Sequence, residues 1–349
     1  MIAATSEHQA HAWADRALPT PEQIIPGLWA IALPAASGPL AYTLVYVFET
    51  GDGVALVDTS WGTDETHSAL SSALGVIGYG IRDITTVAVT HMHPDHFGLV
   101  PRLLSENPRT RLVMHTKDLM LVDHRGDAVR SGNHADWLEL MTSIGAPGEL
   151  EVTNRGKVMH RLDLSQQDQV TEVEDGERIQ FGNWEIEAIW TPGHTPGHLC
   201  FAIGGTNKLV SGDHVLPTIT PLVAQLTGRQ PNVLGAYLAS LRRLRDRHFG
   251  EVLPAHQFRF TGADERIDEL IAHHDERFRI LEEAVHGSPG MTCFDLAPSM
   301  NWKHPLSTMP TDQARLAVKE TLAHLLHLKG TGRLQERPGP PSTWWPVAA

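Results

Sequence analysis

The chain has 349 residues with a formal net charge of −13, and its composition, 41% hydrophobic and 20% charged, suits a globular protein with a sizeable core. The negative charge disfavours nucleic acid as the main partner, because binding to a phosphate backbone depends on clustered Lys and Arg. The two cysteines, Cys200 and Cys293, lie far apart in the sequence, so nothing favours an oxidising compartment.

Residues 1–24 are predicted to form an N-terminal arm. The polar start from Met1 to Arg16 has neither the basic beginning nor the apolar centre of a signal peptide. No apolar stretch approaches the length that crosses a membrane. We therefore expect a soluble, cytoplasmic protein that does not bind membranes.

Three strands are predicted next, over residues 27–33, 42–48 and 54–58, because apolar and β-branched residues alternate with turns rich in Pro, Gly and Ser. They would open a sheet as a β-meander. Asp58 ends the third strand. Its carboxylate could cap the helix predicted over residues 63–78, or it could orient a group bound to a metal, and the two roles are compatible.

A dense cluster of polar residues follows the next predicted strand, residues 84–89. The segment His91-Met92-His93-Pro94-Asp95-His96 holds three histidines and one aspartate at the carboxyl end of that strand, where α/β folds usually carry their chemistry. Neutral imidazole and carboxylate suit zinc, manganese or iron. Because the chain has 21 histidines, an accidental cluster is the alternative. The pattern and its position favour a metal site.

The segment after the cluster continues the α/β pattern. A helix over 99–106 and a strand over 111–115 would complete a right-handed βαβ unit. Residues 117–156 are then mainly helical in pattern, with His134 and Trp137 on one face. This stretch either caps the active site, with His134 and Trp137 in the pocket wall, or packs its apolar stripe on the sheet.

Further strand ends carry the same residue types. Strands are predicted over 176–181, 184–190, 199–203, 208–213 and 251–256. The turn Thr191-Pro192-Gly193-His194 is rigid, since Pro and Gly restrict it, and it holds His194 at the sheet edge. Asp213 and His256 end their strands directly. With Asp58 and the His91 cluster, five strand ends would meet at one metal-binding edge.

This ordered set of motifs resembles the metallo-β-lactamase superfamily over about residues 25–258. The resemblance implies an α/β (α+β) fold, an αββα sandwich of two sheets between outer helices. It implies two divalent metal ions. We expect these to be zinc, with manganese or iron as alternatives. By resemblance the first ion would be bound by His91, His93 and His194, the second by Asp95, His96 and His256, and both by Asp213. The residues expected around these ligands or in the pocket are Asp58, His198 and His214.

The C-terminal region predicts a second domain. Helices are expected over 267–286, 291–297 and 311–328 and resemble the small winged-helix-like domain of one branch of the superfamily. The predicted organisation is an arm (1–24), a catalytic domain (25–260), a helical winged-helix-like domain (261–336) and an extended Pro-rich tail (337–349). Arg315, Lys319 and Lys329 lie beside acidic residues and form no basic stripe. By analogy, the arm and the appended domain suggest a homodimer.

The predicted function is a dinuclear-metal-dependent hydrolase that cleaves an ester, thioester, lactone or related bond in a small molecule. Two metal ions would lower the pKa of a bridging water and supply hydroxide near neutral pH, with Asp95 and Asp213 as the catalytic carboxylates. The alternative is a metal-dependent endoribonuclease or phosphodiesterase of the same fold. A diiron redox protein would normally need a flavodoxin-like segment, which this sequence lacks, and a binding-only scaffold would not require seven ligand positions.

Overall fold

The computed structural model describes residues 1–36, 40–123, 134–147, 169–225 and 232–347. The chain divides into two compact units, and neither is a continuous segment of the sequence. The first, the catalytic unit, comprises Met1–Val129, Val158–Pro221 and Ser240–Ile267. The second, the C-terminal unit, comprises Arg130–Lys157, Leu222–Ala239 and Asp268–Ala349. The predicted domain boundaries at residues 24, 260 and 336 stay predictions.

The first sheet of the catalytic unit has seven strands in the order β2-β3-β4-β5-β6-β7-β8. Strands β2 to β5 pair antiparallel, as the predicted meander requires, and β5 to β8 pair parallel. The parallel pairs β5–β6 and β6–β7 need crossover helices, which α2 (Asp64–Val76) and α4 (Val100–Glu106) supply. The strands are β2 (Glu22–Ile25), β3 (Leu28–Pro34), β4 (Tyr42–Glu49), β5 (Val54–Val57), β6 (Ile84–Ala88), β7 (Arg111–His115) and β8 (Val170–Val173).

The second sheet also has seven strands, in the order β1-β14-β13-β12-β11-β10-β9. Within the described part of this sheet, only β12 and β13 pair parallel. The strands are β1 (Ala3–Ala4), β9 (Arg178–Phe181), β10 (Trp184–Trp190), β11 (Leu199–Ile203), β12 (Lys208–Gly212), β13 (Glu251–Pro254) and β14 (Phe260–Thr261). Residues 1–24, expected as an arm, contain structure of their own. Strand β1 extends the sheet at β14, and Ser6 caps helix α1 (Glu7–Ala14).

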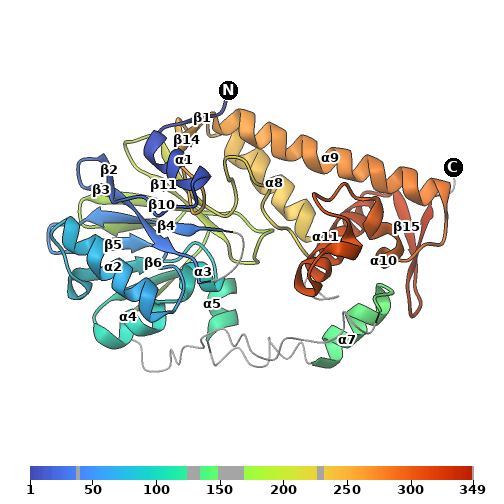
Figure 1. The fold of residues 1–349 in the computed structure, drawn as a ribbon, viewed down its shortest axis with the longest axis horizontal. Helices are drawn as coiled ribbons and strands as arrows, with labels where there is room; N and C mark the ends of the chain where they lie inside the picture. The colour runs from blue at the N-terminus through green and yellow to red at the C-terminus, as the bar shows by residue number, and fades with distance from the viewer. Residues whose placement is uncertain (37–39, 124–133, 148–168, 226–231, 348–349) are drawn as a thin grey trace. The chain divides into compact units, whose positions relative to one another are not determined.

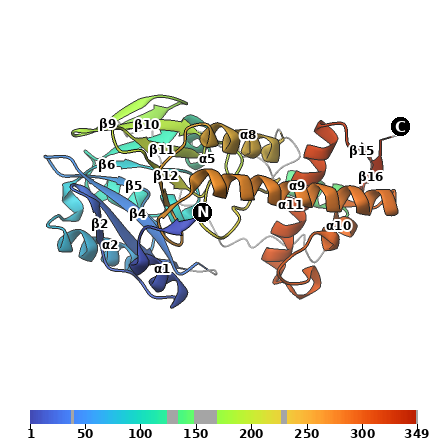
Figure 2. The ribbon, with the colours of Figure 1, turned by 90° about the horizontal axis from the view of Figure 1, so that it is seen from above.

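The catalytic unit is a layered sandwich. Alternate residues of β4 point to opposite sides of the first sheet: Leu44, Tyr46 and Phe48 join a core shared with the second sheet, whereas Val45 and Val47 pack against the helical side. That helical side is covered by α2 (Asp64–Val76), α4 (Val100–Glu106) and α5 (Thr116–Val122). Figure 2 shows β9, β10 and β11 in one layer and β2, β4 and β5 in the other. The αββα prediction is confirmed.

The C-terminal unit is mainly helical (Figure 1). Its elements include most of α9 (Ala263–Gly287), then α10 (Cys293–Leu296), η5 (Ala297–Ser299), η6 (Leu306–Thr308) and α11 (Thr311–Gly330). Within the predicted extended tail, β16 (Thr343–Pro346) pairs with β15 (Leu334–Arg337) to form a hairpin. The pairing buries Trp344, which is 1% exposed. The winged-helix likeness stays a prediction.

Helix α7 (His134–Ser143) belongs to the predicted cap segment. The chain that follows it is tied to the C-terminal unit: the Ile144 carbonyl accepts from the Phe294 N–H at 3.0 Å, and the Ser143 carbonyl accepts from the Ser342 N–H at 2.8 Å. These contacts lie within the C-terminal unit, and both roles predicted for this stretch stay predictions. The side chains of His134 and Trp137, predicted for the pocket wall, lie outside the described residues.

The remaining short elements are η1 (Ile81–Asp83) and α3 (Pro94–Phe97), while α8 (Val233–Arg245) precedes β13. On α8, Arg243 donates to the Trp190 carbonyl at 2.6 Å and pairs with Asp175, which fixes the end of this helix against β10. None of the described helices is long and apolar enough to cross a lipid bilayer.

Candidate metal centre

Three predicted histidine ligands come together at the edge of the two sheets. His91 and His93 follow β6, and His194 lies in the turn after β10. The Nε2 atom of His91 lies 3.0 Å from Nδ1 of His93, and Nε2 of His194 lies 2.9 Å from that Nδ1 and 3.2 Å from Nε2 of His91. These three ring nitrogens could hold one metal ion.

A second trio lies beside the first. The side chains of Asp95, His96 and His256 present ligand atoms that all lie within 4.8 Å of one another. The Oδ2 atom of Asp95 is 3.8 Å from Nε2 of His96 and 3.5 Å from Nε2 of His256. His256 follows the end of β13 by two residues, so a residue more than 150 positions downstream completes the site begun by the His91 cluster.

Asp213, which follows β12, lies between the two trios. Its Oδ1 atom is 3.2 Å from Nε2 of His256 and 3.6 Å from Nε2 of His96. Its Oδ2 atom is 3.5 Å from Nε2 of His194. One carboxylate oxygen therefore faces each trio, which is the arrangement that a bridging ligand needs.

Groups behind the histidines fix which ring nitrogen faces the centre. The Nδ1 atom of His96 is 2.8 Å from Oδ2 of Asp58, and the Nδ1 atom of His256 is 3.2 Å from the Tyr42 carbonyl. Because both partners accept, both Nδ1 atoms carry a proton, so Nε2 is the atom of each ring that would bind a metal. A ligating histidine typically has such an acceptor behind it, since it sets the tautomer and the ring orientation.

The contact with His96 is compatible with one of the two roles predicted for Asp58. Asp58 does not cap the following helix, since Thr63 caps α2. Its carboxylate instead accepts from Nδ1 of His96 and from the backbone N–H and hydroxyl of Thr90. At φ +66° the Asp58 backbone adopts the sparsely populated left-handed region, in which Asp is tolerated better than most residues.

The pKa values of the buried groups show that the centre favours positive charge. Burial lowers the pKa of His93 to about 3, so this imidazole is neutral at pH 7. Burial also opposes charge on His256, but the neighbouring Asp213 outweighs it and raises the pKa of His256 to about 9. Burial likewise opposes charge on Asp95, yet His96 and His256 hold its pKa below the usual range. Positive charge is therefore favoured where the carboxylates and Nε2 atoms converge.

The donor set fits a divalent metal ion. The Nε2 atoms of His96 and His256 and the Oδ1 atom of Asp213 are buried, and among the described residues they make no well-aligned hydrogen bond, although this Oδ1 lies 3.2 Å from Nε2 of His256. Unpaired buried lone pairs are costly unless a cation engages them. A mixture of imidazole and carboxylate ligands suits zinc, manganese or iron better than magnesium or calcium.

The two histidines predicted to lie near the ligands are both buried. His198 accepts from the Asp213 N–H through Nε2 at 3.2 Å, and its Nδ1 pairs with the Thr191 hydroxyl at 2.8 Å. It therefore supports the backbone of Asp213. The His214 ring centroid lies 5.6 Å from that of His198. Burial lowers the pKa of His214 to about 3, so it is a neutral neighbour of the centre.

Two residues that the sequence did not single out also contact these loops. Thr90 donates to Asp58, and Asp118 accepts from Met92, Thr195 and Gly197. Thr90 immediately precedes the His91 cluster. Asp118 follows the end of β7 by three residues, and the carboxyl ends of parallel strands share one edge. That strand-end rule was the available signal for Asp118.

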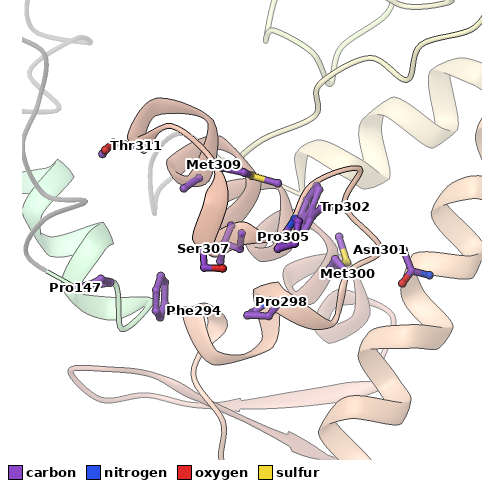
Figure 3. A pocket seen from close by; sticks show the side chains of 12 residues that line it. Pro147, Phe294, Pro298, Met300, Asn301, Trp302, Pro305, Ser307, Met309 and Thr311 are labelled. Carbon is purple, nitrogen blue, oxygen red and sulfur yellow. The ribbon is translucent and has the colours of Figure 1, made fainter.

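A cavity of about 690 Å³ lies within the C-terminal unit (Figure 3). Its walls are mainly apolar and include Phe294, Met300, Trp302 and Met309. None of its lining residues is titratable. This cavity therefore offers no group for metal binding or proton transfer, and it is separate from the candidate centre.

A family model described as the metallo-beta-lactamase superfamily matches residues 38–256, well over half of the chain. The chain belongs to the metallo-beta-lactamase superfamily. The match includes all seven predicted metal-ligand positions.

Similar proteins of this superfamily include fungal relatives. The chain is 27% identical over 248 residues to the lactamase-like protein adaB of Aspergillus niger, an alignment that covers 70% of this chain and 59% of that protein. It is 25% identical over 325 residues to the lactamase-like protein nscB of Aspergillus fumigatus, which covers 88% of this chain and 79% of that protein. The chain thus spans less than two thirds of the first relative.

Solved metallo-beta-lactamase superfamily structures match over nearly the whole chain. A metallo-beta-lactamase family protein from Thermus thermophilus has a TM-score of 0.78 and 27% identity, covering 93% of this chain and 100% of that one. A beta-lactamase domain protein from Burkholderia ambifaria has a TM-score of 0.73 and 23% identity, covering 93% and 94%. At this lower identity the second match concerns the fold alone.

Proposed function

We propose that this protein is a dinuclear metal hydrolase that cleaves an ester, thioester, lactone or related bond in a small molecule. The single observation that carries the proposal is the position of Asp213, whose Oδ1 faces His96 and His256 while its Oδ2 faces His194. A centre for a single ion has no need of a carboxylate between two ligand trios. We propose zinc as the metal, with manganese or iron as alternatives.

Two carboxylates of this chain, Asp213 and Asp95, would have different roles in the reaction. Bound divalent ions supply hydroxide from water near neutral pH and stabilise the negative charge that develops on the substrate. Asp213 would hold the ions at a fixed separation. The Asp95 side chain is 17% exposed, against 12% for Asp213, so it is the more accessible carboxylate. We assign Asp95 the transfer of a proton through its carboxylate oxygen from the attacking water to the leaving group.

A small molecule is the substrate that the charge distribution favours over RNA. The cations of α11 that could have formed a basic stripe are engaged elsewhere. Arg315 pairs with Asp312 at 2.9 Å, Lys329 pairs with Glu336 at 2.8 Å, and Lys319 is buried at 7% exposure. Together with the net charge of −13, these pairs weaken the endoribonuclease alternative.

The test is a substrate panel. Full-length protein loaded with zinc or manganese is assayed on acyl esters, a thioester, a lactone and a β-lactam. We expect turnover on at least one class and a loss of about a hundredfold or more in Asp213→Ala, since metal ions contribute several kcal/mol to such reactions. Asp52→Asn, at a surface turn where it accepts from the Thr50 hydroxyl, is the matched control and should retain activity. Absence of turnover with both metals would overturn the proposal.

We also propose a homodimer, in which the N-terminal residues 1–24 and the C-terminal unit would contact the second copy. The measurement is sedimentation equilibrium of the full-length protein at micromolar concentration. A monomer throughout that range would contradict this assignment without affecting the proposed chemistry.

A further inference from the structure

Asp118 is a fully buried carboxylate in the first turn of α5. It lies between two loops that are far apart in the sequence. One is the His91 cluster, which follows β6 of the first sheet. The other is the turn between β10 and β11 of the second sheet, which carries His194. The two loops supply all three ligands of the three-histidine trio.

Each hydrogen bond of this carboxylate reaches one of those loops. Its Oδ2 accepts from the Met92 N–H at 3.0 Å and from the Thr195 hydroxyl at 2.6 Å. Its Oδ1 accepts from the Gly197 N–H at 2.6 Å. Met92 lies between His91 and His93, and Thr195 follows His194. The carboxylate therefore joins residues adjacent to all three histidines without touching a ligating atom.

A glycine in the turn between β10 and β11 allows α5 to approach this turn closely. A Cβ atom on Gly197 would lie 2.5 Å from the Asp118 nitrogen and 2.8 Å from its Cβ. Any larger residue at position 197 would push the turn away from Asp118. Glycine is required there for steric reasons, so the contact depends on residues at both ends.

We propose that Asp118 is a positioning residue that sets the separation of His194 from His91 and His93. This inference deepens the proposed function and rests on it. The three histidines come from two different sheets, so sandwich packing alone leaves their spacing open to small shifts of either loop. A buried, charge-assisted link removes that freedom, and ligand geometry has to be held within about half an ångström to be productive.

The other half of the centre is held independently of Asp118. His96 is oriented by Asp58 and His256 by the Tyr42 carbonyl. Loss of Asp118 should therefore weaken binding at the three-histidine position and leave the Asp95, His96 and His256 position unchanged. This asymmetry distinguishes positioning from general destabilisation.

The decisive variant is Asp118→Asn. Whichever way its amide is turned, its NH₂ group faces a backbone N–H, either that of Gly197 or that of Met92, so at least one bond is lost. Metal-free, full-length protein is titrated with zinc against a chromophoric chelator, and cobalt(II) absorption reports the coordination geometry. We expect one binding step to weaken by about 10–100-fold, the usual effect of losing a group that orients ligands. The cobalt spectrum should change while the other step is unaffected.

Two further variants make the result unambiguous. Thr195→Val removes one donor and keeps the carboxylate, so it should weaken the same step to a smaller extent. Glu251→Gln is the stability control, because Glu251 is a buried carboxylate of the same unit that pairs with Lys208 and Arg259, away from these loops. It should lower thermal stability and leave both binding steps unchanged.

The outcomes separate this inference from the proposed function. Wild-type affinity and spectrum in both Asp118→Asn and Thr195→Val would overturn the positioning role, as would equal weakening of both steps. If Asp118→Asn does not fold, Thr195→Val decides alone. Wild-type protein that binds a single ion would contradict the dinuclear proposal, and Asp118 would then be judged by its effect on the affinity for that ion.

Discussion

The Oδ2 atom of Asp58 lies 2.8 Å from Nδ1 of His96, and both side chains are buried. Asp58 is held in turn by the backbone N–H of Thr90 at 2.8 Å and by the Thr90 hydroxyl. The carboxylate keeps the proton of His96 on Nδ1, so Nε2 can act as a ligand. This contact supports one half of the metal centre, as Asp118 supports the other.

Asp58→Asn should weaken the metal position formed by Asp95, His96 and His256. An amide in place of the carboxylate gives His96 a poorer acceptor, so we expect a loss of about 10–100-fold in affinity for one of two zinc ions. Chelator competition measures it. Asp52→Asn at the surface turn should bind both ions normally. The expectation fails if Asp58→Asn weakens the three-histidine position instead.

Gly98→Ala should destabilise the loop that carries His96. An added Cβ would lie 2.4 Å from both the Gly62 nitrogen and the Pro94 carbonyl oxygen. Overpacking of this kind costs about 1–3 kcal/mol, which thermal unfolding detects. Gly75→Ala in α2 meets nothing within 4 Å and should be neutral or stabilising. Equal effects of the two substitutions would contradict this account.

Stability should fall in acid because of two buried histidines in the C-terminal unit. The Nδ1 atom of His274 lies 3.0 Å from Nε2 of His324. Burial lowers the pKa of His324 to about 3 and that of His274 well below its ordinary value. Below about pH 6.5 the unfolded chain therefore binds protons that the folded chain does not, and each histidine costs about 1.4 kcal/mol per pH unit.

The measurement is urea unfolding at about pH 7.5 and about pH 5.5, where the two histidines together should cost about 3 kcal/mol. The double variant His274→Leu with His324→Leu should lose that part of the pH dependence. The neighbouring Glu320 is present in both proteins. Burial raises its pKa to about 7, so its contribution to the free energy of unfolding increases as the pH falls, opposite to that of the histidines. An identical pH dependence in variant and wild type would refute the assignment.

Removal of metal should lower thermal stability. An ion that binds only the folded state at about a thousand times its Kd adds about 4 kcal/mol per site. Without ions, the buried ring nitrogens and carboxylates of the centre lose the cations that engage them. Calorimetry with and without chelator measures the change in melting temperature. This change should be smaller in Asp213→Ala than in the wild type. A melting temperature that does not respond to the chelator would argue against a bound metal.

Most strands and the ligand-bearing loops followed from local pattern. β-branched runs that end in polar turns predicted β5, β6, β10 and β12, because alternation and turn chemistry are properties of adjacent residues. The tail after Arg337 was expected to be extended, but its pairing through β16 with β15, with Trp344 buried, was not predicted. Proline content describes local stiffness and does not reveal a pairing partner. For the same reason the contacts of α7 with the C-terminal unit could not be foreseen.

The sequence by itself determined the types and order of the site residues, from the His91 cluster to His256. Each lies at the end of a strand, and strand ends can be recognised within a few residues. Only the tertiary structure decided that Asp213 lies between the two trios, that Asp58 orients His96 and that Asp118 joins two loops. These contacts depend on the packing of one sheet on the other, which brings together atoms whose sequence separation carries no local signal.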